Sequence, residues 1–280
     1  MQRLRVAAVG HVEWVQFARV DHVPRAGEVV HARDAFEEPA GGGAVAAVQL
    51  ARLAGESLLI TALGEDELTE RSLLRLRELG VHVCAVRRPA PTRRAVTLLD
   101  DAGERTITTV GPRLEPLIAD AQLPWSTLGD MDAIYFTAGD EGALRAARAA
   151  RVLVASPRAR EAIGHGVALD ALVLSEDDEI ERREAAKAQA EAEVLLTTRG
   201  ARGGVYRTRG GESGTWDPVP AEAAVDSYGC GDSFAAGFAY GRASGMSLQE
   251  ALSLAARCGA ACARGSGPYE RQLTAREALG

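Results

Sequence analysis

The chain has 280 residues, of which 46% are apolar and 25% are charged, values typical of one globular α/β protein of enzyme size. Its formal net charge of −7 at pH 7 argues against nucleic acid as a main ligand, because such binding requires a basic surface. No apolar run reaches the roughly 18 residues of a membrane-spanning helix, and the apolar stretch at 6–10 is too short for a signal peptide. We therefore expect a cytoplasmic protein with no membrane partner.

The first part of the chain predicts one buried strand and two pairs of alternating strands. The buried strand spans residues 4–10. One alternating pair spans 12–36, and the other spans 94–110 around a turn at 100–103. Because alternating strands bury only one face, we expect them to form a small exposed sheet beside the core sheet.

The remainder of the chain alternates short apolar runs with segments of helical composition. The predicted strands are 58–63, 133–137, 152–155, 171–174 and 194–198, and the predicted helices are 68–79, 141–150 and 178–191. This order is typical of a mostly parallel sheet with helices on both faces, and we predict a single α/β domain over residues 1–280. We interpret most of the acidic stretch 176–193 as a solvated helix face.

A glycine-rich motif lies at residues 226–234, which read D-S-Y-G-C-G-D-S-F and run into a helix-compatible apolar segment. Gly229 and Gly231 flank the small residue Cys230, so successive backbone N–H groups can turn toward one point at a helix start, where the helix dipole favours an anion. At the edge of this anion hole, Asp232 could take a proton from a hydroxyl that attacks a phosphoryl group. The alternative is that Asp232 is an N-cap and that the glycines form a simple turn.

Together with Gly41-Gly42-Gly43 and the A-R-L segment at 51–53, this motif resembles the signature of the ribokinase-like, or phosphofructokinase B-type, carbohydrate kinases. The family signature D-T-x-G-A-G-D-x-F differs only at positions 227 and 230, and the resemblance covers nearly the whole chain. It implies a ribokinase-like fold in which the alternating strands form a lid over the substrate. It also implies ATP-dependent transfer of the γ-phosphate to a hydroxymethyl group of a small sugar, with Asp232 as the base and residues 229–232 as the anion hole.

The resemblance further implies binding residues for the nucleotide, the metal and the acceptor. The nucleotide residues are Thr198, Gly200, Gly203, Ser175 and Gly259, and the acceptor residues are Glu13, Gly41, Gly42, Gly43 and Val45. Mg²⁺ would be held through water by Glu176 and Asp178, although a helix N-terminus also prefers such carboxylates. For 198–203 a glycine-rich hairpin is the alternative. A monovalent cation near the carbonyls of residues 226 and 228 is also implied, and the sequence leaves it open.

Other sequence features argue against a Walker-type phosphate loop, paired cysteines and a dedicated metal site. Lys187 is the chain's single lysine and no Gly-Lys pair exists, which excludes a Walker-type phosphate loop. The four cysteines form no C-x-x-C pair, so we expect reduced structural thiols. The five histidines lack metal-ligand spacing, which argues against a dedicated zinc or iron site.

Several positions depart from the family pattern. Val45 and Val15 stand where the family has its acceptor-binding Asn and Asp, and Ser156 and Ser175 each replace an Asn. Because an unpaired buried polar group costs about 1–3 kcal/mol, a pocket with fewer polar partners should disfavour a richly hydroxylated sugar. We therefore expect an acceptor with fewer hydroxyl groups than ribose or fructose, or one with a flat apolar part.

Aromatic side chains bear on the second possibility. Trp14 and Phe36 could stack on a flat acceptor, although lid packing is the alternative for Trp14 and for Phe17.

A nucleoside kinase of the same family is the first alternative function. A non-catalytic ligand-binding protein on the same fold is the second, and the presence of Asp232 favours an enzyme. Because lid strands leave open sheet edges, we also expect a homodimer formed through the lid.

Overall fold

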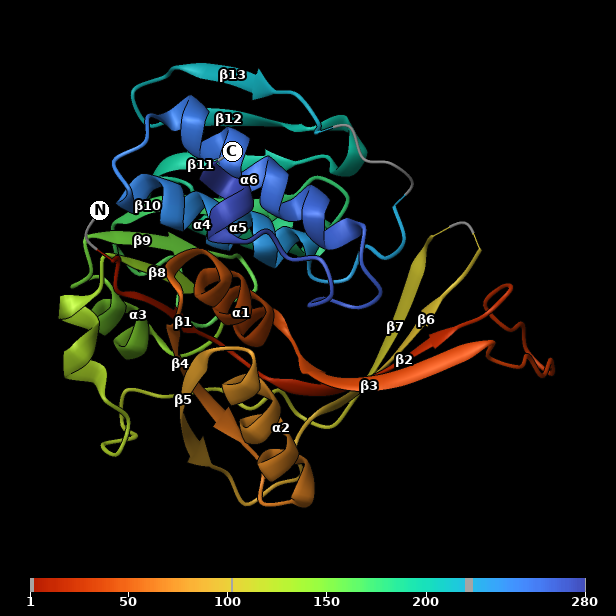
Figure 1. Ribbon diagram of the computed structural model, residues 1–280. Helices are drawn as coiled ribbons and strands as arrows, with labels where there is room; N and C mark the ends of the chain where they lie inside the picture. Colours follow the sequence, from red (N-terminus) through yellow and green to blue (C-terminus); the bar gives the residue numbers. More distant parts are fainter. Residues whose placement is uncertain (1–2, 102, 220–223, 280) are drawn as a thin grey trace.

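The computed structural model describes residues 3–101, 103–219 and 224–279. Within these ranges the chain forms one large sheet covered by helices and one small sheet that projects from it (Figure 1). No helix of these ranges combines the length and the apolar character needed to cross a membrane. The predicted fold class is confirmed.

The large sheet has nine strands. They are β1 (Val6–Val9), β4 (Ser57–Leu63), β5 (Val81–Arg87), β8 (Ala133–Phe136), β9 (Val152–Ala155), β10 (Leu169–Ser175), β11 (Ala192–Thr198), β12 (Gly204–Thr208) and β13 (Ser213–Trp216). Their order is β13-β12-β11-β10-β9-β8-β1-β4-β5. From β11 to β5 all neighbours pair in parallel, and β12 and β13 extend the sheet antiparallel. The carboxyl ends of the parallel strands therefore share one edge, where ligands collect in open α/β sheets.

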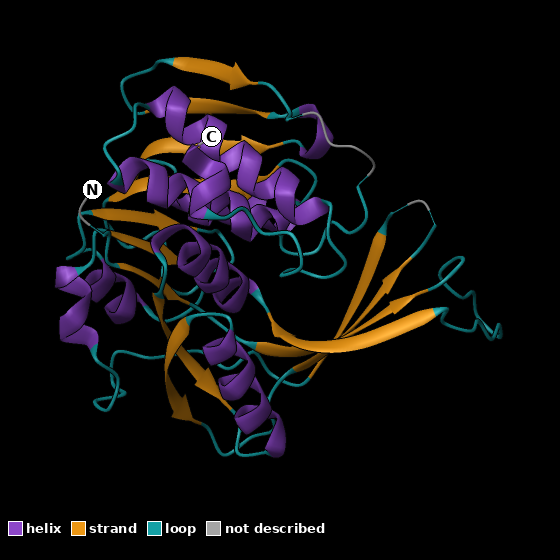
Figure 2. Cartoon of the chain, in the orientation of Figure 1, coloured by secondary structure: helices purple, strands orange, loops and turns teal. Residues whose placement is uncertain are grey.

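Helices cover both faces of the large sheet (Figure 2). They are α1 (Gly42–Ala54), α2 (Glu67–Glu78), α3 (Glu141–Ala147), α4 (Glu179–Ala188), α5 (Cys230–Ala243), α6 (Leu248–Ala263) and α7 (Ala275–Leu279), with 3-10 turns at Trp125–Asp130 and Gly200–Arg202. One core cluster joins α1, α5 and α6 to one face, and a second joins α3 and α4 to the other. Alternate residues of each strand contribute to the two clusters, as the strand period of two requires: in β1, Ala8 packs in the first and Ala7 in the second.

The small sheet has four strands, β2 (Glu13–Arg19), β3 (Asp34–Ala40), β6 (Arg94–Leu99) and β7 (Arg105–Val110), in the order β3-β2-β6-β7. Two antiparallel hairpins, β2–β3 and β6–β7, are joined by a parallel pairing of β2 with β6. Its first hairpin runs on to residue 40, beyond the expected end at 36, so β3 leads directly into α1. Residue 102 of the expected turn lies outside the described residues.

The sequence analysis left out three strands. Strands β5, β12 and β13 had no prediction, although they complete both ends of the large sheet. Most of the acidic stretch 176–193 is solvated as expected, but Glu181 and Glu184 of α4 are buried.

Candidate active site

The anion-hole motif forms the start of α5. Gly229 precedes the helix with φ +78, a left-handed conformation that favours glycine. The described structure gives no hydrogen bond to the N–H groups of Cys230, Gly231 and Asp232, so these donors are available to a ligand. The buried carboxylate of Asp226 fixes the preceding loop by accepting from the N–H groups of Tyr228 at 2.8 Å and Gly267 at 3.0 Å.

Asp232 lies within the first turn of α5 and is only 7% exposed. Its Oδ1 accepts a hydrogen bond from the hydroxyl of Tyr135 at 3.1 Å, and its Oδ2 lies 3.8 Å from Nη1 of Arg158. Gly229 is the N-cap of α5, so the alternative that Asp232 caps this helix is wrong. Burial, and then the charge of Asp232, raise the pKa of Tyr135 well above its ordinary value. Tyr135 therefore keeps its proton and remains a donor to Asp232.

Gly42 opens a space beside Asp232. A Cβ atom at Gly42 would lie 2.9 Å from Oδ1 of Asp232 and 3.0 Å from Oγ1 of Thr137. The Thr137 hydroxyl is buried and has no hydrogen-bond partner within the described residues. The fold thus places the predicted acceptor residue Gly42 beside the predicted base Asp232. The small space at Gly42, which we call the cradle, is also bordered by the unpaired hydroxyl of Thr137.

Arg158 connects Asp232 to the end of β10. Its Nε donates to Glu181 Oε1 at 2.6 Å, and Oε2 of the same carboxylate accepts from the N–H of Ser175 at 2.8 Å. Burial lowers the pKa of Arg158, but Asp232 and Glu181 outweigh that effect and raise it, so the guanidinium stays charged. A charged network therefore links the predicted base to the predicted nucleotide side of the site.

Two predicted nucleotide residues, Ser175 and Thr198, are neighbours at the carboxyl ends of β10 and β11. The Thr198 hydroxyl donates to the carbonyl of Leu174 at 3.2 Å. Gly203 has φ +75, and a Cβ there would lie 2.2 Å from the carbonyl oxygen of Trp216. The segment 198–203 joins the antiparallel strands β11 and β12, so the hairpin alternative describes its structure correctly. The third glycine of the nucleotide set, Gly259, lies on α6 against the carbonyl of Cys230.

The two predicted metal residues differ in how many of their carboxylate oxygens are free of other partners. Glu176 accepts from Arg199 at 2.8 Å and from Arg202 at 3.0 Å, so both of its oxygens have cationic partners. Asp178 is the N-cap of α4, where Oδ1 accepts from two backbone N–H groups at 3.0 Å, and within the described residues Oδ2 has no hydrogen-bond or ion-pair partner. No cluster of three or more metal-ligating side chains occurs in the part of the chain described. The Asp178 carboxylate therefore keeps a free oxygen for the predicted water-mediated Mg²⁺ site, whereas the charge of Glu176 is already offset by two guanidinium groups.

The predicted acceptor residue Glu13 is buried at the start of β2. It accepts from the Tyr228 hydroxyl at 3.1 Å, and its other oxygen lies 3.3 Å from Nε of Arg93. The Tyr228 oxygen in turn accepts from the N–H of Gly41 at 3.2 Å. Glu13 therefore ties the small sheet to the loop before α5 and to the start of α1.

The two valines at the altered acceptor positions are completely buried. A Cβ at Gly229 would lie 2.8 Å from Cγ1 of Val45, so Val45 supports the backbone of the anion hole. Val15 lies in the same core cluster as Val45. Neither offers a hydrogen bond, in agreement with a pocket poor in partners for sugar hydroxyls.

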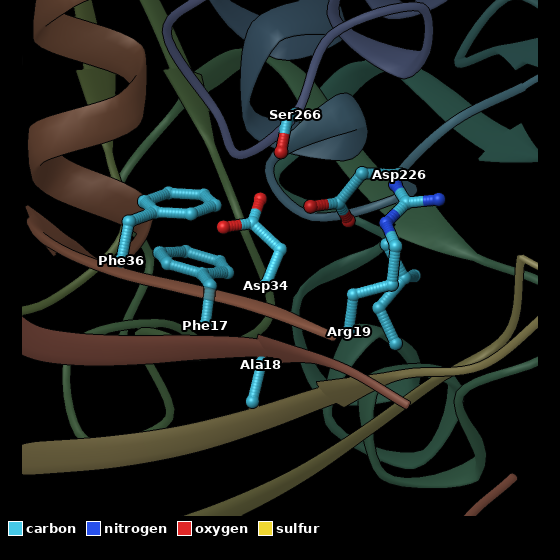
Figure 3. A pocket seen from close by; sticks show the side chains of 8 residues that line it. Phe17, Ala18, Arg19, Asp34, Phe36, Asp226 and Ser266 are labelled. Carbon is cyan, nitrogen blue, oxygen red and sulfur yellow. The ribbon is translucent and has the colours of Figure 1, made fainter. Parts of the chain in front are cut away.

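The aromatic residues of the small sheet divide between its faces. Trp14 packs under the guanidinium of Arg71 at 4.2 Å and donates to Glu37 at 3.0 Å, so its surroundings are α2 and β3. Phe17 and Phe36 stack with ring centroids 4.8 Å apart, and the Phe17 ring meets Tyr228 edge-on at 5.0 Å. Figure 3 shows a small pocket beside this stack, between the small sheet and the loop that carries Asp226. Of the expected stacking residues, only Phe36 borders this pocket.

Comparison with known proteins identifies the family. The family model for the pfkB family carbohydrate kinases matches residues 3–275. The chain belongs to this family. It is an ATP-dependent phosphotransferase that uses an alcohol group as acceptor.

This kinase is similar to several known proteins. It is 26% identical over 274 residues to the ATP-dependent ribose-1-phosphate kinase of Halopiger xanaduensis, covering 92% of this chain and 91% of the relative. A putative ribokinase from Agrobacterium tumefaciens superposes with a TM-score of 0.80 at 21% identity, covering 99% of this chain and 97% of that one. The Arabidopsis thaliana ribokinase complexed with ribose and ATP gives a TM-score of 0.74 at 20% identity, covering 99% and 98%.

The carbonyls implied as monovalent-cation ligands of this pfkB kinase face thiols. The Tyr228 carbonyl lies 3.3 Å from Sγ of Cys262, and the Asp226 carbonyl lies 3.8 Å from Sγ of Cys230. Each of these carbonyl oxygens has a second lone pair, so the thiol contacts do not occupy it fully, and the monovalent-cation site stays a prediction.

Sequence reasoning missed several polar side chains at the site: His11, Arg93, Tyr135, Thr137, Arg158 and Glu181. A signal existed for two of them. Thr137 directly follows β8, and Arg158 follows β9 by three residues, where the strand-end rule places ligand contacts. His11 and Arg93 directly precede the alternating pairs at 12–36 and 94–110, which the sequence assigned to one small sheet, but the pairing of β2 with β6 has no local signal.

Proposed function

We propose that this kinase transfers the γ-phosphate of ATP to a hydroxymethyl group of a small sugar or sugar-like acceptor. The position of Asp232 carries the proposal, because the carboxylate lies beside both the free N–H groups of α5 and the cradle at Gly42. A hydroxyl in that cradle would be within reach of the base, and a phosphoryl group at the helix start would be within reach of that hydroxyl.

In the proposed reaction, each nearby group has a role that follows from its contacts. Asp232 orients the acceptor hydroxyl and takes its proton. Tyr135 donates to Oδ1 and thereby fixes the carboxylate, and Oδ1, which faces the cradle at Gly42, keeps a lone pair for the acceptor hydroxyl. The N–H groups of Cys230 and Gly231 stabilise charge on the transferring phosphoryl oxygens. Arg158, charged and beside Oδ2, adds positive charge at the same point.

The nucleotide is proposed to lie along the ends of β10 and β11, with Ser175, Thr198, Gly200, Gly203 and Gly259 lining its site. Mg²⁺, when bound with ATP, would offset charge on the phosphates, and Asp178 would hold it through water. Arg158 and Glu181 connect this side to Asp232, so nucleotide and base share one charged framework.

The test is a steady-state survey of ATP-dependent phosphorylation. Acceptors are ribose, fructose, their deoxy analogues and a set of nucleosides, with ADP release and product mass measured together. We expect a phosphorylated product, and we expect ribose and fructose to stay below about 10⁵ M⁻¹s⁻¹ in kcat/KM because Val15 and Val45 offer their hydroxyls no partner. Turnover highest for nucleosides would support the nucleoside kinase alternative. If no acceptor is phosphorylated, the proposed function is wrong.

We also propose that the small sheet forms a homodimer. All six residues of β7 are exposed, and Val96, Ile107 and Val110 present apolar side chains that are 37%, 40% and 48% exposed. An open edge strand with apolar side chains favours pairing with a second copy. Light scattering should give twice the chain mass of 29.5 kDa, and Val96→Thr with Val110→Thr should lower it. A wild-type monomer would contradict the proposal.

A further inference from the structure

Two thiols lie together at the start of α5. Cys230 is the first residue of α5 and is half-buried, and Cys262 is buried in the last turn of α6. The Cys262 thiol lies 3.3 Å from the carbonyl of Tyr228, two residues before Cys230. A Cβ atom at Gly259, one turn earlier on α6, would lie 3.2 Å from the carbonyl of Cys230. One face of α6 therefore packs directly against the backbone that begins α5.

The two thiols also interact with each other. A hydrogen bond to Cys230, and then burial, raise the pKa of Cys262 well above its ordinary value. The end of α6 holds the loop before Cys230 as well, because the N–H groups of Val225 and Asp226 donate to the carbonyl of Ala263 at 2.7 Å and 3.2 Å. These backbone hydrogen bonds keep the two sulfur atoms close together.

The other two cysteines belong to different surroundings. Cys258 is buried on α6 against α5, where a Cβ at Gly237 would lie 2.6 Å from its Sγ. Cys84 lies on β5, an end strand of the large sheet, and packs with the core cluster on the opposite face from α5. The reaction proposed above uses only the backbone of Cys230, so it leaves the paired thiols without a role.

We propose that Cys230 and Cys262 form a reversible disulfide that lowers phosphoryl transfer when a peroxide is present. The Cys230 sulfur is the more accessible, and it attacks a peroxide oxygen. The O–O bond breaks, hydroxide leaves with the thiol proton as water, and Cys230 becomes a sulfenic acid. The Cys262 sulfur then attacks the Cys230 sulfur, the S–O bond breaks, and a second water leaves with the Cys262 proton. The two thiols lose two electrons, and hydrogen peroxide is reduced to two waters.

The disulfide would displace the start of α5. Bonded sulfur atoms lie about 2.0 Å apart, much closer than two thiols in contact. Cys262 is held within α6, whereas Cys230 follows the loop glycine Gly229, so we expect the displacement to be largest at Cys230. Its N–H group and that of Gly231 are proposed to bind the phosphoryl oxygens, and a misplacement of about 1 Å at a reacting centre can cost 10²-fold in rate. The effect on turnover rests on the proposed function, but formation of the disulfide does not.

The first arm of the test detects the bond. The protein is treated with hydrogen peroxide, the remaining thiols are alkylated under denaturing conditions, and intact mass and a peptide map are recorded. We expect a mass loss of two hydrogen atoms and one linked pair of peptides, containing Cys230 and Cys262. A dithiol reductant should restore both thiols. Oxidation of Cys230 to sulfinic acid without a linked pair, or a link to Cys258 or Cys84, would overturn the inference.

The second arm compares two variants of α6. Oxidation should lower wild-type turnover about 10- to 100-fold, and the dithiol should restore it. Cys262→Ala should match the reduced wild type before oxidation but should not recover after excess peroxide, because a sulfenic acid without a partner thiol oxidises further. Cys258→Ala, which removes a buried thiol one turn away, should recover like the wild type.

Unfolding temperatures of both variants check for a folding defect. If Cys262→Ala is unstable, Cys262→Ser replaces it, because serine keeps a donor for the Tyr228 carbonyl. Full recovery in the Cys262 variant, or failed recovery in Cys258→Ala, would contradict the proposal.

The third arm separates this inference from the proposed function. Calorimetry compares binding of ATP to the reduced and the linked protein without an acceptor, and we expect about 10-fold weaker binding to the linked form, the effect of one charge-assisted contact. If ATP binding weakens in this way and no acceptor is phosphorylated by the reduced protein, the switch stands and the proposed function fails. If the linked protein equals the reduced protein in ATP affinity and in turnover of a sugar, the proposed function stands and this inference fails.

Discussion

Replacing Asp232 by Asn should lower kcat by about 10²–10⁴-fold, the usual contribution of a positioned general base. The amide has nearly the same shape and can still accept from Tyr135, but it cannot take the proton of the acceptor hydroxyl. KM for ATP should stay nearly unchanged, because the nucleotide is proposed to bind through β10, β11 and the N–H groups of α5. Steady-state kinetics with varied ATP and varied acceptor measure both effects.

The matched control is Asp140→Asn. Asp140 is the N-cap of α3 and accepts from the N–H of Ala143 at 2.8 Å, a role that Asn fills about equally well. Turnover and unfolding temperature should therefore match those of the wild type. Near-normal turnover in Asp232→Asn, with the control unchanged, would contradict the role of Asp232 as base.

Valine substitutions at Gly229 and Gly231 should both abolish turnover, but for different reasons. At Gly229 the φ of +78 and the contact of a Cβ with Val45 at 2.8 Å oppose any side chain, so Gly229→Val should also lower the unfolding temperature. At Gly231 a Cβ meets open space and φ is not positive, so we expect a stable protein whose phosphate-binding space is filled. From the sequence, we expected valine at either glycine to abolish activity by forcing the turn out of its conformation. The structure supports this reason for Gly229 only, because Gly231 does not need a glycine conformation.

Cys230→Ala is the control for this pair. Cys230 lies between the two glycines, and its backbone N–H is the group proposed to act, so alanine should leave turnover close to that of the wild type. Thermal unfolding and steady-state kinetics on the three variants give the result. A normal rate in Gly231→Val would contradict binding of the phosphoryl group at the start of α5. A large loss of turnover in Cys230→Ala would show that the thiol takes part.

The sequence predicted those parts of the fold that depend on local pattern. The runs at 58–63, 152–155 and 94–99 appear as β4, β9 and β6 with nearly the expected ends, because apolar period and turn residues determine them locally. The glycine motif before Asp232 likewise identified a helix start. Strand β5 escaped prediction because its residues are largely half-buried or exposed, which weakens the apolar signal.

The rest of the site depends on contacts that are distant in sequence. Tyr135 and Asp232 are 97 residues apart, and Glu13 and Tyr228 are 215 residues apart. No local pattern encodes such pairs. The orientation of Trp14 is a similar case: strand alternation places it on the face opposite Glu13, but only the packing of α2 decides that this face is covered.

Tyr228 connects the small sheet to the start of α5 through side-chain contacts. Its ring meets Phe17, its hydroxyl donates to Glu13, and Arg105 of β7 donates to the carbonyl of Ser227 beside it. Gly229 follows directly, so any displacement of the small sheet either breaks these contacts or moves the helix start. If the phosphoryl group binds at this helix start, as proposed, the position of the small sheet and the shape of the phosphate site cannot change independently of one another.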